Sequence, residues 1–263
     1  MSYRPQLPLH TNLSPEDVAQ ALAEPNATYT LLYWNLNGVA STAREILVYG
    51  KADYKFESAT KKQWWANESP SPFACLPVLT ITTPSKKELV MSETMVIDQF
   101  LAKKFGLLGD TEWEALTILS FYSNIHFLQE RAFENVNIDD DDRKLDARNC
   151  FLKWTLPTFI HNHEFHLRKN GENGHYVGNK LSLADIQLSN IIHYLQTLPF
   201  ATLALPLIRA SVPIWKVHET VRQQPEIAAW RASEAYKRIE EGSFEWYAHT
   251  AVPGENLKAW KED

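Results

Sequence analysis

Strand-forming patterns are confined to the first part of this chain and end before Gly109-Asp110. Before that point short β-rich runs alternate with helical ones. From Thr111 onward the apolar residues recur with helical spacing, and no segment predicts a strand. Each half needs a core of its own, and 263 residues are enough for two modest domains. We therefore expect an α/β domain followed by an all-α domain.

The first part predicts the element order β-α-β-loop-β-β-α, which is that of a thioredoxin-like domain. Tyr29–Trp34 is β-rich and apolar, as in a buried strand, and Gly106 ends the last helix. The predicted elements are strands at 29–34, 52–56, 76–82 and 88–91, with helices at 40–49 and 94–104. We assign residues 28–108 to this domain, after an N-terminal extension at 1–27 with a short helix starting at Ser14.

The second part predicts only helices, and we assign it residues 111–242, followed by an irregular C-terminal tail at 243–263. Ser182 and Asp185 have the spacing of a capping box, in which each side chain satisfies a backbone N–H of the other residue. The acidic run 139–142 lacks the Gly and the distal Glu of a calcium loop and is interpreted as a solvated loop. The predicted helices are 111–135, 143–170, 182–197, 211–223 and 226–239.

Charge and composition limit the kinds of partner and the cellular compartment that we expect. The formal net charge is −6 and the basic residues are scattered, which argues against nucleic acid. No run approaches the roughly 18 apolar residues of a membrane span, and the first residues lack the apolar core of a signal peptide. Cys75 and Cys150 are the only cysteines, which fits a reducing compartment without disulfides. We expect a cytoplasmic protein.

Leu76-Pro77 stands at the start of a predicted buried strand, where a proline cannot donate to the ladder. A cis peptide bond is one explanation, since it turns the N–H and C=O of the preceding residue outward for an extended peptide ligand. A trans proline at a strand edge is the other. The dipeptide alone leaves both open.

Glu93-Thr94 opens a predicted helix, whose first free N–H groups and dipole favour a carboxylate. The Thr94 hydroxyl adds a hydrogen bond to that carboxylate, and Glu93 suits an adjacent ammonium. The pair therefore fits an α-amino-acid head group. The simpler alternative for Thr94 is an ordinary N-cap.

Four motifs in this order resemble the glutathione transferase family, over roughly residues 29 to 240. They are the strand Leu76-Pro77-Val78-Leu79, the helix from Glu93-Thr94 to Leu101, the linker Phe105-Gly-Leu-Leu-Gly-Asp-Thr-Glu112, and Ser182-Leu-Ala-Asp185. Residues 29–38 look most like the sigma class and related tyrosine-type enzymes. The resemblance implies a thioredoxin-like domain before an all-helical one, with glutathione as co-substrate and a homodimer.

The resemblance also implies site residues. Tyr33 falls on the catalytic tyrosine, whose hydroxyl stabilises the glutathione thiolate. The implied glutathione-binding residues are Tyr33, Trp64, Leu76, Pro77, Glu93 and Thr94, with Trp65 as an alternative to Trp64. A hydrophobic electrophile would meet Tyr122, His126 and Trp246. The implied activity is conjugation of glutathione to that electrophile.

Four positions depart from the sigma pattern. Val39 falls where an Arg is usual, and Phe127 where an Asp commonly reaches the partner subunit's glutathione. Glu68 and Cys75 fall where lysines often hold the glycine carboxylate. These departures favour a second hypothesis, a non-catalytic relative with a binding or structural role and a degraded glycyl subsite.

The stretch His161-Asn-His-Glu-Phe-His166 invites a metal hypothesis, but its spacing is not that of His-Glu-x-x-His. A solvated helix face with one buried histidine fits it better. We expect no metal site.

Overall fold

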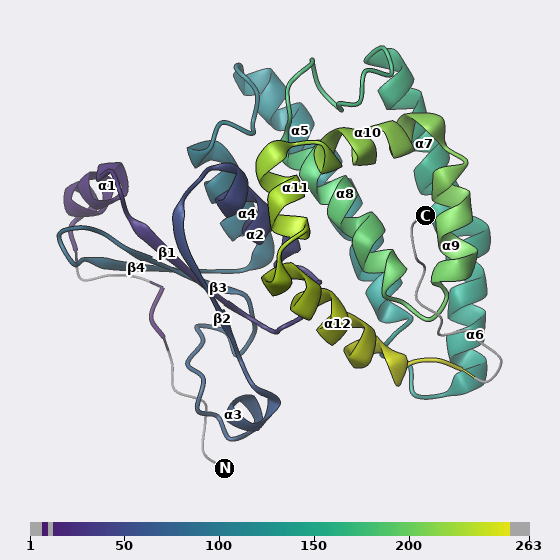
Figure 1. The fold of residues 1–263 in the computed structure, drawn as a ribbon, viewed down its shortest axis with the longest axis horizontal. Coiled ribbons are helices and arrows are strands. Elements are labelled where there is room, and N and C mark those ends of the chain that lie inside the picture. Colours follow the sequence, from purple (N-terminus) through teal and green to yellow (C-terminus); the bar gives the residue numbers. More distant parts are fainter. Residues whose placement is uncertain (1–6, 10–12, 253–263) are drawn as a thin grey trace. The chain divides into compact units, whose positions relative to one another are not determined.

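The computed structural model describes residues 7–9 and 13–252. Contacts divide the chain into two compact units. Unit 1 holds the residues up to 105 apart from 36–38, and unit 2 holds 36–38 and the residues from 106 onward. Figure 1 shows the strands in the first unit and a group of helices in the second.

Unit 1 is built on a four-stranded sheet with the order β2-β1-β3-β4. The strands are β1 (Thr28–Tyr33), β2 (Asp53–Ser58), β3 (Val78–Thr82) and β4 (Glu88–Ser92). β1 pairs with β2 in parallel and with β3 antiparallel, and β3 pairs antiparallel with β4. The helices α2 (Ser41–Tyr49) and α4 (Thr94–Lys104) contact each other. The predicted thioredoxin-like order is confirmed.

A five-residue helix, α3 (Lys61–Trp65), was not predicted. It is held by a capping box in which the Gln63 N–H donates to the Thr60 hydroxyl at 3.2 Å. None of its residues is buried, so the sequence has no apolar periodicity there to reveal a helix.

The predicted N-terminal helix is α1 (Pro15–Ala23), capped by Ser14. Polar contacts hold it against the rest of unit 1. The Glu24 carboxylate accepts from the Ser85 hydroxyl at 2.6 Å and the Ser85 N–H at 3.1 Å, which together lower the Glu24 pKa. Lys104 Nζ donates to the Leu22 carbonyl at 3.1 Å. Helix α1 is therefore an integral part of this unit.

In the described part of unit 2 the regular elements are all helical, as predicted, and α8 (Leu183–Gln196) lies at its centre. Every residue of α8 except His193 is buried, and α5 and α10 pack against it. The other elements are α5 (Glu112–Glu134), α6 (Asp141–Cys150), the π-helical turn η1 (Phe151–Thr155), α7 (Leu156–Lys169), α9 (Ala201–Arg209), α10 (Val212–Arg222), α11 (Pro225–Arg231) and α12 (Glu234–Ala248).

Three helix predictions need correction. The predicted helix 143–170 is α6 and α7 joined by η1. Helix α9 was missed because Pro206 lies inside it, and an internal proline argues against a helix. The predicted helix 226–239 is two helices, because Ser233 caps α12, which then continues to Ala248 through residues predicted to be irregular. The predicted tail beyond 252 lies outside the described residues.

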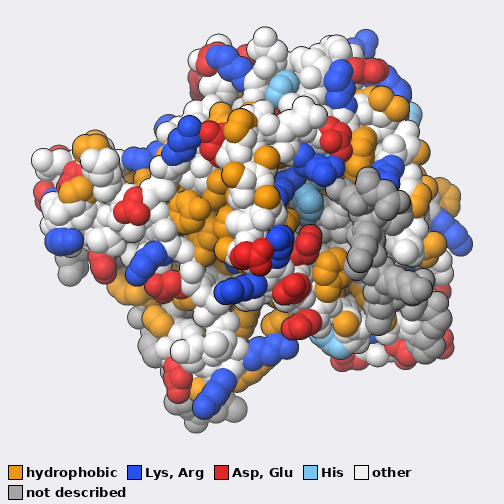
Figure 2. All heavy atoms as spheres, in the orientation of Figure 1, with side chains coloured by type: hydrophobic (Ala, Val, Ile, Leu, Met, Phe, Trp, Pro, Cys, Tyr) orange, Lys and Arg blue, Asp and Glu red, His pale blue; other side chains and the backbone are white. Residues whose placement is uncertain are grey.

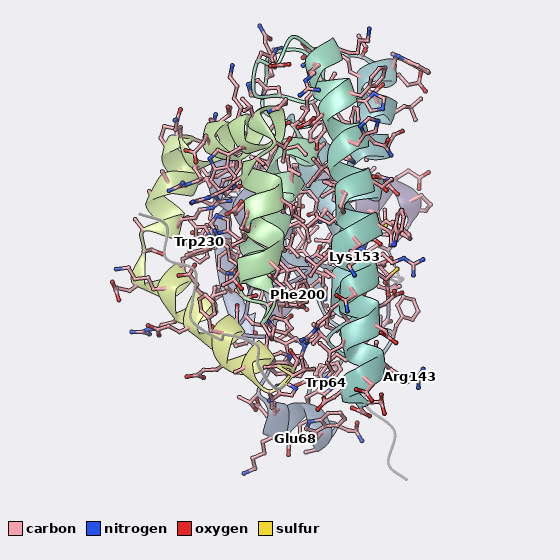
Figure 3. All side chains as sticks on the ribbon, turned by 90° about the vertical axis from the view of Figure 1, so that its right-hand side faces the viewer. Trp64, Glu68, Arg143, Lys153, Phe200 and Trp230 are labelled. Carbon is pink, nitrogen blue, oxygen red and sulfur yellow. The ribbon has the colours of Figure 1, made fainter. Side chains whose placement is uncertain are left out.

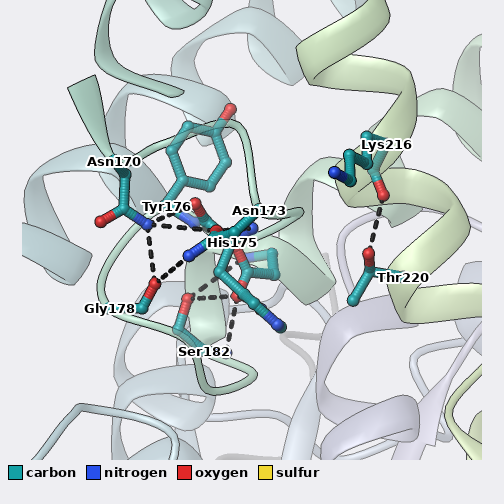
Figure 4. Close-up of polar contacts among 9 residues, drawn as sticks. Asn170, Asn173, His175, Tyr176, Gly178, Ser182, Lys216 and Thr220 are labelled. Atoms are coloured by element: carbon teal, nitrogen blue, oxygen red, sulfur yellow. Dashed lines mark hydrogen bonds and ion pairs between the residues drawn. The ribbon is translucent and has the colours of Figure 1, made fainter. Parts of the chain in front are cut away.

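The predicted capping box of α8 is present and belongs to a larger network (Figure 4). The Asp185 carboxylate accepts from the N–H groups of Ser182 at 2.8 Å and Tyr176 at 2.9 Å. The Asn170 side-chain amide donates to the carbonyls of His175 and Gly178, both at 2.9 Å. A single N-cap contributes about 0.5–2 kcal/mol to stability, so this buried cluster of hydrogen bonds is an important stabilising element of the helical unit.

Within the described residues, no helix combines the length and apolarity needed to cross a membrane. Figure 2 shows Lys and Arg side chains interspersed with Asp and Glu on the face that it draws.

Candidate active site

The peptide bond between Leu76 and Pro77 is cis, which decides between the two conformations that the sequence left open. The β3 ladder begins only at Val78, so Leu76 lies outside it. Within the described part of the chain, the Leu76 N–H and C=O have no hydrogen-bond partner. These two groups are available to an extended ligand lying alongside.

Glu93 has a φ of 72°, in the left-handed region that is unfavourable for a residue with a side chain. Such a conformation costs about 1–3 kcal/mol and is often found at ligand-binding sites. Its carbonyl accepts from the N–H groups of Val96 and Ile97 at 3.1 and 3.0 Å, which starts α4. The side chain of Glu93 is exposed beside the half-buried Thr94.

The first N–H groups of α4 lie directly after Glu93. Those of Thr94 and Met95 precede the first intrahelical hydrogen bond, and no residue that the structure describes accepts from them. With the positive end of the helix dipole they favour an anion such as a carboxylate.

The sheet register brings the two motifs together. Val78 pairs with Ser92, so Pro77 and Glu93 follow at the same end of the β3-β4 ladder. Cys75 Sγ donates to Glu93 Oε1 at 3.4 Å. Burial, followed by the hydrogen bond to Glu93, raises the pKa of the Cys75 thiol. Cys75 is therefore held as a neutral thiol, which is a poor nucleophile.

Tyr33 ends β1 at this same edge, because Leu32 pairs with Val78. Its side chain is 7% exposed. Burial raises the Tyr33 pKa to about 12, although the positive charge of Arg44 and a hydrogen bond from the Val39 N–H oppose this rise. The hydroxyl therefore stays protonated at neutral pH and acts as a hydrogen-bond donor.

The two tryptophan candidates on α3 differ in their surroundings. Trp64 is half-buried and packs edge-on against Trp34, the residue after Tyr33, with ring centroids 5.3 Å apart. Trp65 is 78% exposed. Figure 3 shows Trp64 and Glu68 at the α3 segment. Of the two, Trp64 is the one connected to the Tyr33 strand.

The three residues predicted for the second substrate lie on two helices of unit 2. Tyr122 on α5 has no exposed surface and packs in the core of the unit. His126, one turn further on, is 9% exposed, and its Nε2 is 3.4 Å from Glu130 Oε1. Burial lowers the His126 pKa, and the charge of Glu130 opposes this. Trp246 is half-buried on α12.

His163 is the buried histidine of the suspected metal motif. Its Nε2 donates to Asn124 Oδ1 at 2.9 Å, and its Nδ1 accepts from the Tyr176 hydroxyl at 2.6 Å. Both ring nitrogens are thus engaged. Among the described residues, no group of three or more His, Cys, Asp or Glu side chains is arranged to hold a metal.

Residues 128–234 match a family model described as glutathione S-transferase, C-terminal domain. Glutathione S-transferase S1 of Drosophila melanogaster is 30% identical over 171 residues, which is 64% of this chain and 65% of that protein. The match thus spans slightly less than two thirds of this relative's length.

Several solved structures are also similar to this chain. Prostaglandin synthase D of Nilaparvata lugens is 25% identical with a TM-score of 0.68, covering 79% of this chain and 98% of that one. The family model, the Drosophila relative and this structure together support a member of the glutathione S-transferase family. The sigma class GST of Fasciola hepatica shares the fold, at 21% identity and a TM-score of 0.67 over 80% of this chain and 99% of that one. Na-GST-3 of Necator americanus, described as monomeric, is 25% identical with a TM-score of 0.60, over 77% and 95% of the two chains.

One member of the site was missed by sequence reasoning. Arg44 on α2 is buried, and its guanidinium carbon lies 5.4 Å from the centroid of the Tyr33 ring. The available signal was a charged residue inside the predicted helix 40–49.

The buried His163 predicts a loss of stability in acid. Burial, together with the charge of His166, lowers the His163 pKa to about 3. Below the unfolded pKa of about 6.5 the unfolded chain binds a proton that the folded chain does not, so stability falls as the pH drops from about 6.5 towards 3. We expect His163 to account for about 2 kcal/mol of lost unfolding free energy between pH 7 and pH 5.

Urea unfolding of the wild type and of His163→Gln at both pH values measures this loss. The variant should be less stable at pH 7 but lose about 2 kcal/mol less on acidification. His161→Gln, an exposed change on the same helix, is the control and should follow the wild type. Equal acid sensitivity in wild type and His163→Gln would contradict the expectation.

Proposed function

We propose that this chain is a glutathione transferase that conjugates glutathione to a hydrophobic electrophile through a tyrosine-stabilised thiolate. The observation that carries the proposal is the register of β1, β3 and β4, which puts Tyr33, Leu76-Pro77 and Glu93-Thr94 at one end of the sheet. The match to the family model supports it, as do relatives named glutathione S-transferase. The two free cysteines favour a cytosolic protein.

The γ-glutamyl end of glutathione is the best-supported part of the proposed binding mode. Its α-carboxylate would accept from the Thr94 hydroxyl and the free N–H groups at the start of α4. Its ammonium would pair with the exposed Glu93 carboxylate. The cysteinyl backbone would hydrogen-bond to the Leu76 N–H and C=O as an added strand does.

Tyr33 would act on the sulfur. A free thiol has a pKa of about 8.5, so little of it is ionised at neutral pH. A protonated hydroxyl that donates to sulfur stabilises the thiolate and releases the thiol proton to solvent. The thiolate then forms a bond to the electrophilic carbon and, in a substitution, the leaving group departs with the bonding electrons.

The alternative is a non-catalytic family member that binds or scaffolds. Two observations favour it at the glycyl end. Glu68, in place of an expected lysine, would repel the glycine carboxylate. Cys75, at the other expected lysine, is uncharged and hydrogen-bonded to Glu93.

Tyr33→Phe separates the two functions. Because a hydrogen bond to a charged group contributes about 1.5–3 kcal/mol, we expect kcat/KM for chlorodinitrobenzene conjugation at pH 6.5 to fall about 10- to 100-fold. Tyr29→Phe is the matched control, since Tyr29 is buried on the same strand and should keep wild-type activity.

Two outcomes count against these assignments. A wild type without turnover, identical to Tyr33→Phe, would support the non-catalytic alternative. An active wild type whose Tyr33→Phe variant keeps full activity would remove Tyr33 from the mechanism.

Glu68→Lys tests the glycyl end. Replacing repulsion by attraction at a surface position is worth up to about 1 kcal/mol, so we expect the KM for glutathione to fall about two- to fivefold. The same charge change at the exposed Glu57 of β2 should leave KM unchanged and serves as control. An unchanged KM in Glu68→Lys would mean that residue 68 does not face the glycine carboxylate.

We further propose a homodimer that uses α5. Five of its exposed positions, 113, 116, 120, 123 and 127, have the three-four spacing of a helix-packing seam. Trp113, Leu116 and Phe127 on this seam are 77%, 51% and 47% exposed. A wide, open depression lined by Leu116, Ser120, Ser123 and Phe127 lies along it. Large apolar side chains gathered on one exposed helix face are typical of an interface.

Light scattering after size exclusion tests the dimer, with a wild-type mass expected at about twice the 30.2 kDa of one chain. Leu116→Glu with Phe127→Glu should shift the protein to the monomer. Leu203→Glu, an exposed apolar residue on α9, should not. A monomeric wild type at micromolar concentration would contradict the proposal.

A further inference from the structure

Arg44 is a buried cation beside the proposed thiol activator. Its side chain is on α2 and is 3% exposed. Nη2 donates to the Trp34 carbonyl at 2.8 Å, and the guanidinium carbon lies 5.4 Å from the Tyr33 ring centroid and 6.0 Å from that of Phe56. The guanidinium is thus held between the end of β1 and the neighbouring strand β2.

The residue that faces the Tyr33 hydroxyl from the loop supplies no charge. Position 39, where related enzymes usually carry an arginine, is a valine, and only its backbone N–H reaches the hydroxyl. The positive charge that acts on Tyr33 comes from Arg44 instead.

We propose that Arg44 is a positioning residue of the conjugation reaction, whose buried charge acts through Tyr33 to strengthen the hydrogen bond donated to the glutathione thiolate. The inference rests on the function proposed above. It assigns to Arg44 the electrostatic role that the valine at position 39 does not fill.

The physical reason is the polarisation of the phenol. A cation near the ring favours negative charge on the phenol oxygen, so the O–H becomes a stronger donor to sulfur. In a buried setting water screens this effect little.

Other charged groups around α2 do not take this role. Glu45, the next residue, and Asp98 of α4, which packs against α2, are both 1% exposed and negative when ionised. Asp53, Lys55 and Glu57 of β2 lie on its exposed face. The charge that favours the anionic form of Tyr33 is that of Arg44.

Two variants separate the charge of Arg44 from its hydrogen bond. Arg44→Gln keeps an N–H donor for the Trp34 carbonyl and removes the charge, whereas Arg44→Lys keeps both. The readouts are the ultraviolet absorbance of the bound thiolate against pH, and the pH profile of kcat/KM for chlorodinitrobenzene.

For Arg44→Gln we expect the pKa of the bound thiol to rise by about one unit, with kcat/KM at pH 6.5 roughly tenfold lower and the difference vanishing at high pH. The KM for glutathione should change less than twofold, and Arg44→Lys should restore the wild-type profile. In a Tyr33→Phe background Arg44→Gln should add no further shift.

Several results would overturn the inference. One is a folded Arg44→Gln protein with the wild-type thiol pKa, and another is the same tenfold loss in the Tyr33→Phe background. A wild type that binds glutathione without a thiolate band would reject the proposed function together with this role. A wild type with the band, unchanged in Arg44→Gln, would reject the role of Arg44 alone.

Val39→Arg in the otherwise wild-type chain keeps the test open if Arg44→Gln does not fold. A cation at position 39 adds its charge to that of Arg44, so the thiol pKa should fall further in Val39→Arg but not in Val39→Arg combined with Tyr33→Phe. A folded Val39→Arg protein with the wild-type thiol pKa, or an equal fall in the Tyr33→Phe background, would contradict an effect that acts through the Tyr33 hydroxyl.

Discussion

The register of β3 between its two neighbours is the constraint on which the site depends. Val78 pairs with Leu32 on one side and with Ser92 on the other. Pro77 precedes Val78, whereas Tyr33 and Glu93 follow Leu32 and Ser92 on the antiparallel neighbours, so the three residues lie together at one end of the sheet. A slip of one residue would turn every side chain of the strand to the opposite face. The buried Leu31, Leu79 and Ile81 hold the register by burying their side chains.

Local patterns were predictable because the physics behind them is local. The capping box of Ser182 and Asp185 needs only a three-residue spacing. Leu76-Pro77 is recognisable in the sequence because a proline at the start of a strand cannot donate a hydrogen bond to the ladder. Helices α3 and α9 escaped prediction for opposite reasons. α3 buries nothing and shows no periodicity, whereas α9 buries Ala204 and Leu205 despite its internal proline. Packing outweighs the propensity against Pro206.

The role of Arg44 was out of reach of the sequence for a different reason. Its proximity to Tyr33 is produced by α2 packing beside β1, and no spacing along the chain encodes the distance between the two side chains. The sequence shows only that the usual cation at position 39 is absent. Whether another cation compensates is a property of tertiary structure, because a buried guanidinium must find partners wherever the fold supplies them.

The two ends of the proposed ligand would therefore be recognised under different constraints. The γ-glutamyl end rests on the sheet register and on the start of α4, where a change in backbone also disturbs the core. The glycyl end rests on the segment that carries Trp64 and Glu68, and α3 has no buried residue. Substitutions there leave the core intact and have little effect on stability. Under the proposed binding mode, Glu68 in place of a cation is therefore compatible with an intact fold and an intact γ-glutamyl subsite.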